Sequence, residues 1–298
     1  MVVIILSSGL ISRQLIFADA YISEDKVYYG ADSYTIDYER EIIYAKGHAY
    51  FKKEDRRVQA DRIKIYYSRD KKKAEFFNNV RVQDITQLSE IRGDYGEALF
   101  KEDTYIIEGN ATYKDEKRTV SAQRIRRLKD QRILFSEGVV YSDGTYEIKA
   151  SKLDISDDTA EFTSDVEVLH LESGDIVYCN SLTYLMDLEN VTFQGEVLYL
   201  QKEEQEGKDA LVMRANGVRY FKDQDVFLLL GDVLILTESF TMSTSVAHYM
   251  RNEKKLESTG DIVVSDRTNY IYCNRVSYDE QTKRIIYFNT VQGIVSRR

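Results

Sequence analysis

The chain has few residues of the types that perform catalysis, and they do not stand at the spacings of known catalytic motifs. Its only histidines are His48, His170 and His248, and it contains no H-E-x-x-H, G-x-S-x-G or phosphate-loop motif. His48 directly follows a glycine, and asparagines occupy the corresponding positions further along the chain. We therefore interpret His48 as a turn residue rather than a general base. The sequence predicts no enzyme active site, no metal site and no cofactor.

The two cysteines are the other residues with reactive side chains. Cys179 and Cys273 each stand in the same tripeptide, Tyr-Cys-Asn, and are separated by three copies of a repeat described below. If each copy advances by at least one strand spacing of about 4.8 Å, the two sulfurs lie roughly 14 Å apart or more. A disulfide requires Cα atoms within about 7 Å of each other. We therefore expect two free cysteines that point inward.

Charge argues against nucleic acid as a partner. The 298 residues carry a formal net charge of −9, whereas a protein that binds phosphate backbones needs a basic surface. One local basic strip stands out, and we interpret it as a solvated strand face. The strip consists of Arg124, Arg126, Arg127, Lys129 and Arg132.

A repeat of about thirty residues organises the chain. Each copy begins with a glycine or another small or polar residue, followed by a short strand in which apolar and polar residues alternate. The nine copies are GHAYFK at 47, NNVRVQ at 78, GNATYK at 109, GVVYSD at 138, SDVEVLHL at 164, GEVLYL at 195, GDVLIL at 231, GDIVVS at 260 and NTVQGIV at 289.

A second, weaker segment lies between successive copies and also alternates. It starts with a small residue, such as Ala60 in VQADRIKIYYS or Cys179 in VYCNSLTYLMD, and ends in a charged turn. Alternation with a period of two is typical of strands with one buried face, and no window has the apolar spacing of a helix. The glycines would supply a bend or bulge where two sheets meet.

These patterns predict an elongated, all-β, two-sheet array with a continuous apolar interior, because stacked copies can bury the face that one copy cannot. The array is expected to span residues 21–298, with a polar loop or a boundary between sub-arrays at 201–210. The alternation assigns the following side chains to an inward stripe that could line a groove: Ala49, Phe51, Val80, Val82, Ala111, Tyr113, Val166, Val168, Val197, Tyr199, Val233, Ile235, Ile262 and Val264.

The first twenty residues are expected to act in export. Val2 to Ile11 is largely apolar, and Ala18-Asp19-Ala20 fits a signal-peptidase site. No Lys or Arg precedes the apolar stretch, so an uncleaved anchor or a buried strand remains an alternative interpretation. The sequence therefore predicts a periplasmic protein with a cleaved signal over 1–20, or one anchored to the inner membrane.

The stretch AKGHAYFK…VQADRIKIYYSRD…KAEFFNNVRVQD resembles the OstA-like periplasmic proteins of lipopolysaccharide transport, the LptA, LptC and LptD N-terminal-domain superfamily. The shared motif is a glycine strand, a polar turn and then φ-x-A-D-x-φ-x-φ, where φ is apolar. Ala31-Asp32 and Ala60-Asp61 match it well, and later copies drift to Ala-Gln, Ala-Ser, Cys-Asn and Ala-Asn. The resemblance covers about residues 25 to 295.

The resemblance implies an open β-jellyroll that carries the acyl chains of lipopolysaccharide or another glycolipid between membranes. It also implies partners among Lpt-like inner- and outer-membrane proteins, and head-to-tail self-association, through exposed edge strands. This chain has more copies than a short bridge protein, so its role within such a system stays open.

Two other functions compete with lipid transport. The first is a structural scaffold with a sealed core that polymerises end to end. The second is a surface adhesin or carbohydrate-binding protein, which would more often carry an exposed row of aromatic side chains. Tyr66, Tyr67, Tyr220 and Tyr270 could supply such a row, but sequence alone does not fix their direction.

Overall fold

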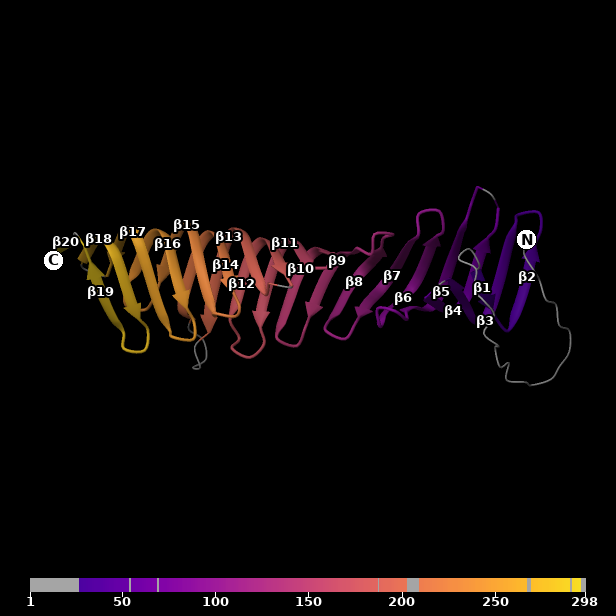
Figure 1. Cartoon of the computed structure of the whole chain (residues 1–298), viewed down its shortest axis with the longest axis horizontal. Helices are drawn as coiled ribbons and strands as arrows, with labels where there is room; N and C mark the ends of the chain where they lie inside the picture. The colour runs from indigo at the N-terminus through magenta and orange to yellow at the C-terminus, as the bar shows by residue number, and fades with distance from the viewer. Residues whose placement is uncertain are drawn as a thin grey trace.

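The computed structural model describes residues 27–53, 55–68, 70–186, 188–202, 209–266, 269–289 and 291–295. The strands follow one another in chain order along the long axis of the molecule, from β1 and β2 at one end to β19 and β20 at the other (Figure 1). They are β1 (Val27–Gly30), β2 (Ser33–Asp37), β3 (Ile42–Lys53), β4 (Arg56–Tyr66), β5 (Lys73–Asp84), β6 (Ser89–Leu99), β7 (Thr104–Lys114), β8 (Thr119–Arg127), β9 (Ile133–Ser142), β10 (Tyr146–Ile155), β11 (Thr159–His170), β12 (Ile176–Leu185), β13 (Asn190–Lys202), β14 (Asp209–Phe221), β15 (Val226–Leu236), β16 (Thr241–Met250), β17 (Lys255–Ser265), β18 (Asn269–Asp279), β19 (Arg284–Phe288) and β20 (Gln292–Val295).

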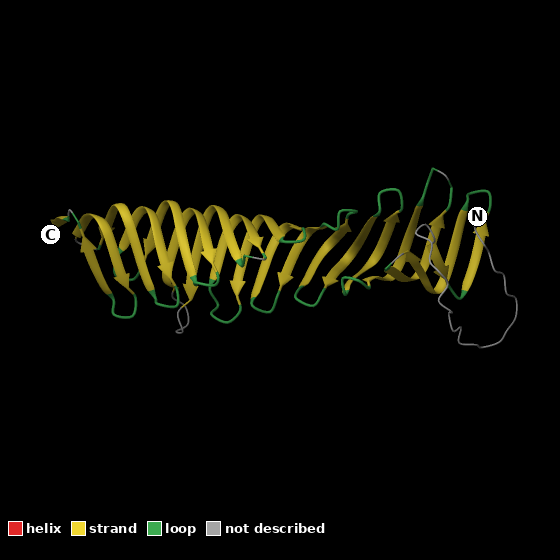
Figure 2. Cartoon of the chain, viewed as in Figure 1, coloured by secondary structure: helices red, strands yellow, loops and turns green. Residues whose placement is uncertain are grey.

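The topology is an antiparallel meander. Each strand from β3 to β18 pairs with its neighbours in sequence, and the described residues form strands and loops without a helix (Figure 2). At each end of the sheet two short strands pair side by side with one long strand. β1 and β2 pair with different halves of β3, and β19 and β20 pair with different halves of β18. The all-β prediction is confirmed. No helix among the described residues has the length and apolarity needed to cross a membrane.

Every long strand that begins a copy of the repeat bends at one point near its middle. In β3 the bend consists of Gly47 and His48, both in the left-handed region with φ of 77° and 41°, and the register with β4 shifts there. The same paired left-handed conformation recurs at Gly109-Asn110, at Gly195-Glu196 and at Gly231-Asp232. Gly47 and His48 together oppose the single residue Asp61 of β4, which is the arrangement of a β-bulge. The predicted bend at the repeat glycine is confirmed.

The aspartate of the Ala-Asp motif contacts the bulge residue of the strand that pairs with it. Asp32 Oδ2 lies 2.9 Å from His48 Nδ1, and Asn79 donates to Asp61 at 2.9 Å. Asn110 donates to Asp94 at 3.1 Å in the following copy. His48 is therefore a bulge residue within β3 rather than a turn residue, and its ring makes the contact that the asparagines make in the next two copies.

The bulges fold each strand so that its two ends approach each other. A flat strand of the length of β4, which has 11 residues, would hold its end turns about 36 Å apart. Instead, turns from opposite strand ends touch: Arg127 Nη2, at the end of β8, lies 2.7 Å from Asp84 Oδ2, at the end of β5. We call the line along which these two series of turns meet the seam. The expected two sheets are thus two layers of one hydrogen-bonded sheet.

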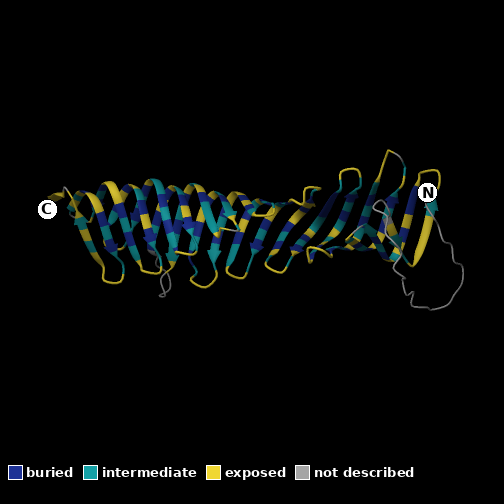
Figure 3. Ribbon diagram, in the orientation of Figure 1, coloured by how far each residue is buried: buried dark blue, intermediate teal, exposed yellow. Residues whose placement is uncertain are grey.

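The apolar core fills the space between the two layers. Buried positions alternate with exposed ones along the strands (Figure 3). All fourteen side chains predicted to point inward are buried, with at most 6% of their surface exposed. Rings from the two layers pack on each other, as Phe51 and Phe76 do with centroids 6.1 Å apart, and Tyr113 and Phe135 at 5.9 Å.

Two directional predictions need correction. Arg127 was assigned to a solvated strip, but it alternates with the exposed Arg126, faces the interior and is 2% exposed. Tyr220, one of four candidates for an outer aromatic row, is 5% exposed and belongs to the core, whereas Tyr67 and Tyr270 are exposed. Both misplaced side chains are amphipathic and end in a polar cluster at the seam, described below.

Other features agree with the sequence. Cys179 and Cys273 are free and buried, and burial raises the pKa of the Cys179 thiol to about 12. Strands β13 and β14 pair with each other on either side of the expected loop, from Lys202 opposite Asp209 onwards. Residues 203–208 of that loop and the proposed signal over 1–20 lie outside the described residues.

Candidate functional site

The interior is the most extended feature of the molecule that could bind a ligand. The buried residues form one apolar cluster that reaches from Ile43 in β3 to Tyr278 in β18. Its chemistry is that of a hydrocarbon phase, because the members are aliphatic and aromatic side chains with few charged groups. No group of His, Cys, Asp or Glu among the described residues is arranged to hold a metal ion. The interior is therefore apolar along the length of the described sheet.

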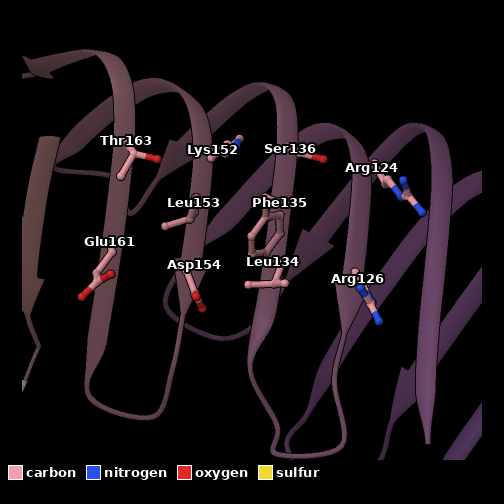
Figure 4. Close-up of a pocket in the computed structure, with 10 residues that line it drawn as sticks. All are labelled: Arg124, Arg126, Leu134, Phe135, Ser136, Lys152, Leu153, Asp154, Glu161 and Thr163. Carbon is pink, nitrogen blue, oxygen red and sulfur yellow. The ribbon is translucent and has the colours of Figure 1, made fainter. Parts of the chain in front are cut away.

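A hollow on the outer face is a second feature. It has a volume of about 440 Å³ and lies over β8 to β11, and its charged lining residues are Arg124, Arg126, Lys152, Asp154 and Glu161 (Figure 4). These side chains alternate with buried residues such as Ile125 and Leu153, so they lie on the outside of the sheet. The charges are mixed, and the apolar part of the lining consists of Leu134, Phe135 and Leu153. The hollow therefore selects no particular class of ligand.

The seam carries two polar clusters at the mouth of the apolar interior. The N-terminal seam cluster consists of Lys53, Arg56, Asp84, Asp103 and Arg127. Lys53 and Arg56 flank the β3–β4 turn, and their nitrogens lie 3.4 and 3.5 Å from Asp103 Oδ1 in the β6–β7 turn. Arg127 pairs with Asp84 at 2.7 Å, and Arg56 Nε lies 3.8 Å from the same carboxylate. These contacts join turns from opposite ends of the strands.

Arg127 is the most buried charged side chain of this cluster. Its Nη2 atom has three acceptors, namely Asp84, Gln87 Oε1 at 2.8 Å and Gln131 Oε1 at 2.7 Å. Its Nε atom is also buried but has no hydrogen-bond partner among the described residues. Burial, and then repulsion by Arg56, lower the pKa of Arg127. Three acceptors thus share Nη2 of this guanidinium, whereas its Nε has no acceptor among the described residues.

Aromatic rings lie directly beneath this cluster. The guanidinium carbon of Arg56 is 5.4 Å from the centre of the Tyr105 ring. Phe51, two residues before Lys53, stacks on Phe100 with ring centroids 5.2 Å apart. Charge and apolar surface therefore adjoin at this point of the seam.

The C-terminal seam cluster consists of Asp175, Tyr199, Tyr220, Asp225 and Arg251. Arg251 Nε donates to Asp225 Oδ1 at 2.8 Å, and its Nη1 lies 3.8 Å from Asp175 across the seam. Tyr199 and Tyr220 donate their hydroxyl hydrogens to Asp175 and Asp225, each at 2.9 Å. Both carboxylates are buried, at 5% and 6% exposed. Every named polar group of this cluster has a partner.

Burial and the neighbouring carboxylates keep these side chains in one protonation state. Burial, followed by the charge of Asp175, raises the pKa of Tyr199, so its hydroxyl stays protonated and donates. Burial alone would lower the pKa of Arg251, but the hydrogen bond to Asp225 raises it above its usual value. A cavity of about 30 Å³ adjoins the cluster and is lined by Phe193 and Phe227 among others. It has room for one or two waters and not for an acyl chain.

Sequence reasoning missed both seam clusters. It located the interior side chains, because alternation within a strand reveals direction, but it gave no information on which turns would meet. The available signal was an arginine at an inward position of an alternating strand, as Arg127 is after Val120, Ala122 and Ile125. A charge at such a position requires a partner across the core.

Comparison with known proteins finds a family model and a solved structure that each match part of the chain. Residues 30–132 match the family model described as "LptA/(LptD N-terminal domain) LPS transport protein", which confirms the resemblance over that stretch. That family is described as a transport protein, in agreement with the prediction that the chain is not an enzyme. A search of curated proteins finds no match. Among solved structures, LptH, described as the LptA homologous periplasmic component of the lipopolysaccharide transport device of Pseudomonas aeruginosa, is 16% identical. The match covers 51% of this chain and 95% of LptH, with a TM-score of 0.29.

Proposed function

We propose that this protein is a periplasmic component of lipopolysaccharide-type lipid transport and holds acyl chains between the two layers of its folded sheet. The observation that carries the proposal is the single apolar interior that runs through the whole array without interruption. The match of residues 30–132 to a family of lipopolysaccharide transport proteins supports it. Burial of each CH₂ group of an acyl chain contributes about 0.8 kcal/mol to the free energy of binding. A long apolar interior without polar recognition groups therefore suits a lipid better than a small ligand.

The layers must separate to admit a chain, since the interior side chains now pack against one another. Their hydrogen bonding does not oppose this, because the two layers are joined by the backbone through the bulges and not by a ladder across the core. Among the described residues, side-chain contacts and the polar clusters hold the seam together. Opening along the seam therefore leaves every strand pairing intact.

The two ends offer surfaces for partners. Among the described residues β2 and β19 each pair on one side only, and apolar side chains such as Tyr34, at 46%, and Ile286, at 54%, are exposed there. An unprotected edge is a template for strand addition. We propose that Lpt-like membrane proteins or further copies of this chain add strands at these edges.

A sealed structural scaffold is the second candidate, and the packing of the core favours it. Phe51, Phe76 and Ile235 are fully buried, and the cavity near the C-terminal seam cluster is too small for a lipid. Such a protein would polymerise through its edges and carry nothing.

Photo-crosslinking distinguishes the two candidates. A small diazirine side chain is placed at the inward Val197 or Val233 and, as matched controls, at the adjacent exposed Glu196 or Asp232. The folded variants are incubated with membrane lipid of the source and irradiated. Lipid adducts from the inward positions alone support transport. Folded protein with adducts at neither position refutes it and leaves the scaffold.

A further inference from the structure

The N-terminal seam cluster brings two guanidinium groups together at one carboxylate. Arg56 and Arg127 share Asp84, and Arg56 also lies 3.5 Å from Asp103. Arg127 is 2% exposed and Arg56 has an 11% exposed side chain, so solvent stabilises neither charge well. Two like charges held together in such surroundings are costly, and an added anion would relieve the cost.

The buried guanidinium also has a donor available for that anion. Arg127 Nε lacks an acceptor among the described residues, while three acceptors compete for Nη2. Guanidinium groups bind phosphate through two parallel N–H donors, a geometry that a single carboxylate at Nη2 does not use. Arg56 Nε lies 3.8 Å from the Asp84 carboxylate that Arg127 contacts at 2.7 Å, which places a second guanidinium at the same point.

The position of the cluster selects an amphiphile. Its charges lie at the mouth of the interior, directly above Tyr105 and the stacked rings of Phe51 and Phe100. A ligand with acyl chains between the layers would hold its head group at the seam. From these observations we propose that Arg56 and Arg127 form a binding site for the phosphate group of a phosphorylated lipid. The phosphate replaces Asp84 and Asp103 as their counter-anion when the seam parts.

The assignment rests on the proposed lipid function but adds a head-group requirement that transport alone does not need. It also restricts the site to one half of the molecule. The C-terminal seam cluster has one cation and two carboxylates, all hydrogen-bonded, and it would repel a phosphate.

Lipids that differ only in the phosphate test the site. The full chain is immobilised, and retention of dioleoyl phosphatidic acid and of dioleoylglycerol from non-ionic detergent micelles is measured against concentration. We expect phosphatidic acid to bind about tenfold more tightly, as a charge-assisted pair of hydrogen bonds would provide. Arg127→Met should remove this preference and leave dioleoylglycerol binding unchanged. Arg56→Met provides a second variant should Arg127→Met fail to fold, which circular dichroism would show.

The matched control is Arg124→Met, the same substitution on the same strand but on the outer face, where Arg124 pairs with Glu108 at 3.2 Å. This variant should retain the full preference for phosphatidic acid. An equal loss of the preference in the Arg124 variant would overturn the assignment, because the preference would then not depend on the position of the arginine.

The remaining outcomes separate the two proposals. Equal binding of both lipids by the wild-type chain overturns the phosphate site and leaves lipid transport intact. Binding of neither lipid overturns both. Inorganic phosphate that binds alone, with the same dependence on Arg127, would assign the site to free phosphate and overturn the head-group proposal.

Discussion

The two polar clusters cross the same seam with different ratios of guanidinium to carboxylate groups. In the N-terminal seam cluster two arginines share Asp84, and the buried Nε of Arg127 has no acceptor among the described residues. In the C-terminal seam cluster one arginine lies between two carboxylates, and tyrosine hydroxyls satisfy the remaining oxygens. The first cluster has an unsatisfied donor, and the second is complete.

The difference separates stability from binding. A complete, buried network is costly to damage, because each removed partner leaves another group unsatisfied. An incomplete one contributes less to stability and gains more from a ligand. We therefore expect the C-terminal cluster to hold the layers together, and the N-terminal cluster to be the place where they part.

Removal of Arg251 should have the largest effect. Arg251→Met leaves Asp175 and Asp225 buried without a cation, and loss of one partner of a buried ion pair costs about 3–5 kcal/mol. The free energy of unfolding from chemical denaturation should fall by that amount. Amide exchange should accelerate in β11 to β16 before it does in β3 to β8.

Lys222→Met provides the control in a neighbouring turn. Lys222 lies 3.7 Å from Glu189, and both side chains are substantially exposed, so this pair should contribute less than about 1 kcal/mol. Similar losses from the two substitutions would show that the C-terminal cluster is an ordinary surface ion pair.

Removal of Arg127 should cost less, although this side chain is more deeply buried than Arg251. In Arg127→Met the carboxylate of Asp84 keeps Arg56 at 3.8 Å and the N–H donors of Thr86 and Gln87. The substitution also relieves the repulsion between the arginines. We expect a loss of about 1–3 kcal/mol in the free energy of unfolding. A loss greater than that from Arg251→Met would reverse the comparison.

The sequence predicted the parts of this molecule that depend on local pattern. Alternation in GEVLYL assigned Val197 and Tyr199 to the interior, and the repeat glycines marked the bulges, because both follow from neighbouring residues. The clusters could not be predicted in the same way. Arg127 meets Asp84, 43 positions away in the sequence, only because the strands between them fold and tilt by a particular amount. Alternation reports which face a residue occupies, not which turn it meets.

Mild acid should affect the C-terminal half selectively through His170. Burial, and then the charge of Arg251, lower the pKa of His170 from 6.5, although Asp175, Glu172 and Asp225 oppose the shift. The unfolded chain therefore binds the proton first as pH falls. The stability associated with neutral His170 is fully present above pH 6.5 and is lost as pH falls through its lower folded pKa.

The measurement is the change in unfolding free energy between pH 7 and pH 5 for the wild-type chain and His170→Gln. The wild-type chain should lose more. His48 is the control in the N-terminal half, because its hydrogen bond to Asp32 raises its pKa, and its contribution is lost as pH rises. His48→Gln should therefore not reduce the loss on acidification. An unchanged loss in His170→Gln would mean that this side chain is protonated without cost in the fold.

The smallest change in the free energy of unfolding is expected when both members of the ion pair between Arg127 and Asp84 are replaced by neutral residues. In Arg127→Met combined with Asp84→Asn, the amide oxygen still accepts from the N–H groups of Thr86 and Gln87, so the turn keeps its hydrogen bonds. Replacement of a whole buried ion pair is often neutral or stabilising, so the double variant should lie within about 1 kcal/mol of the wild-type chain. Denaturation of the two single variants and the double variant gives the coupling energy.

A stable double variant that has lost its preference for phosphatidic acid would show that these charges serve binding rather than the fold. A double variant as unstable as Arg127→Met would instead make Arg127 a structural residue.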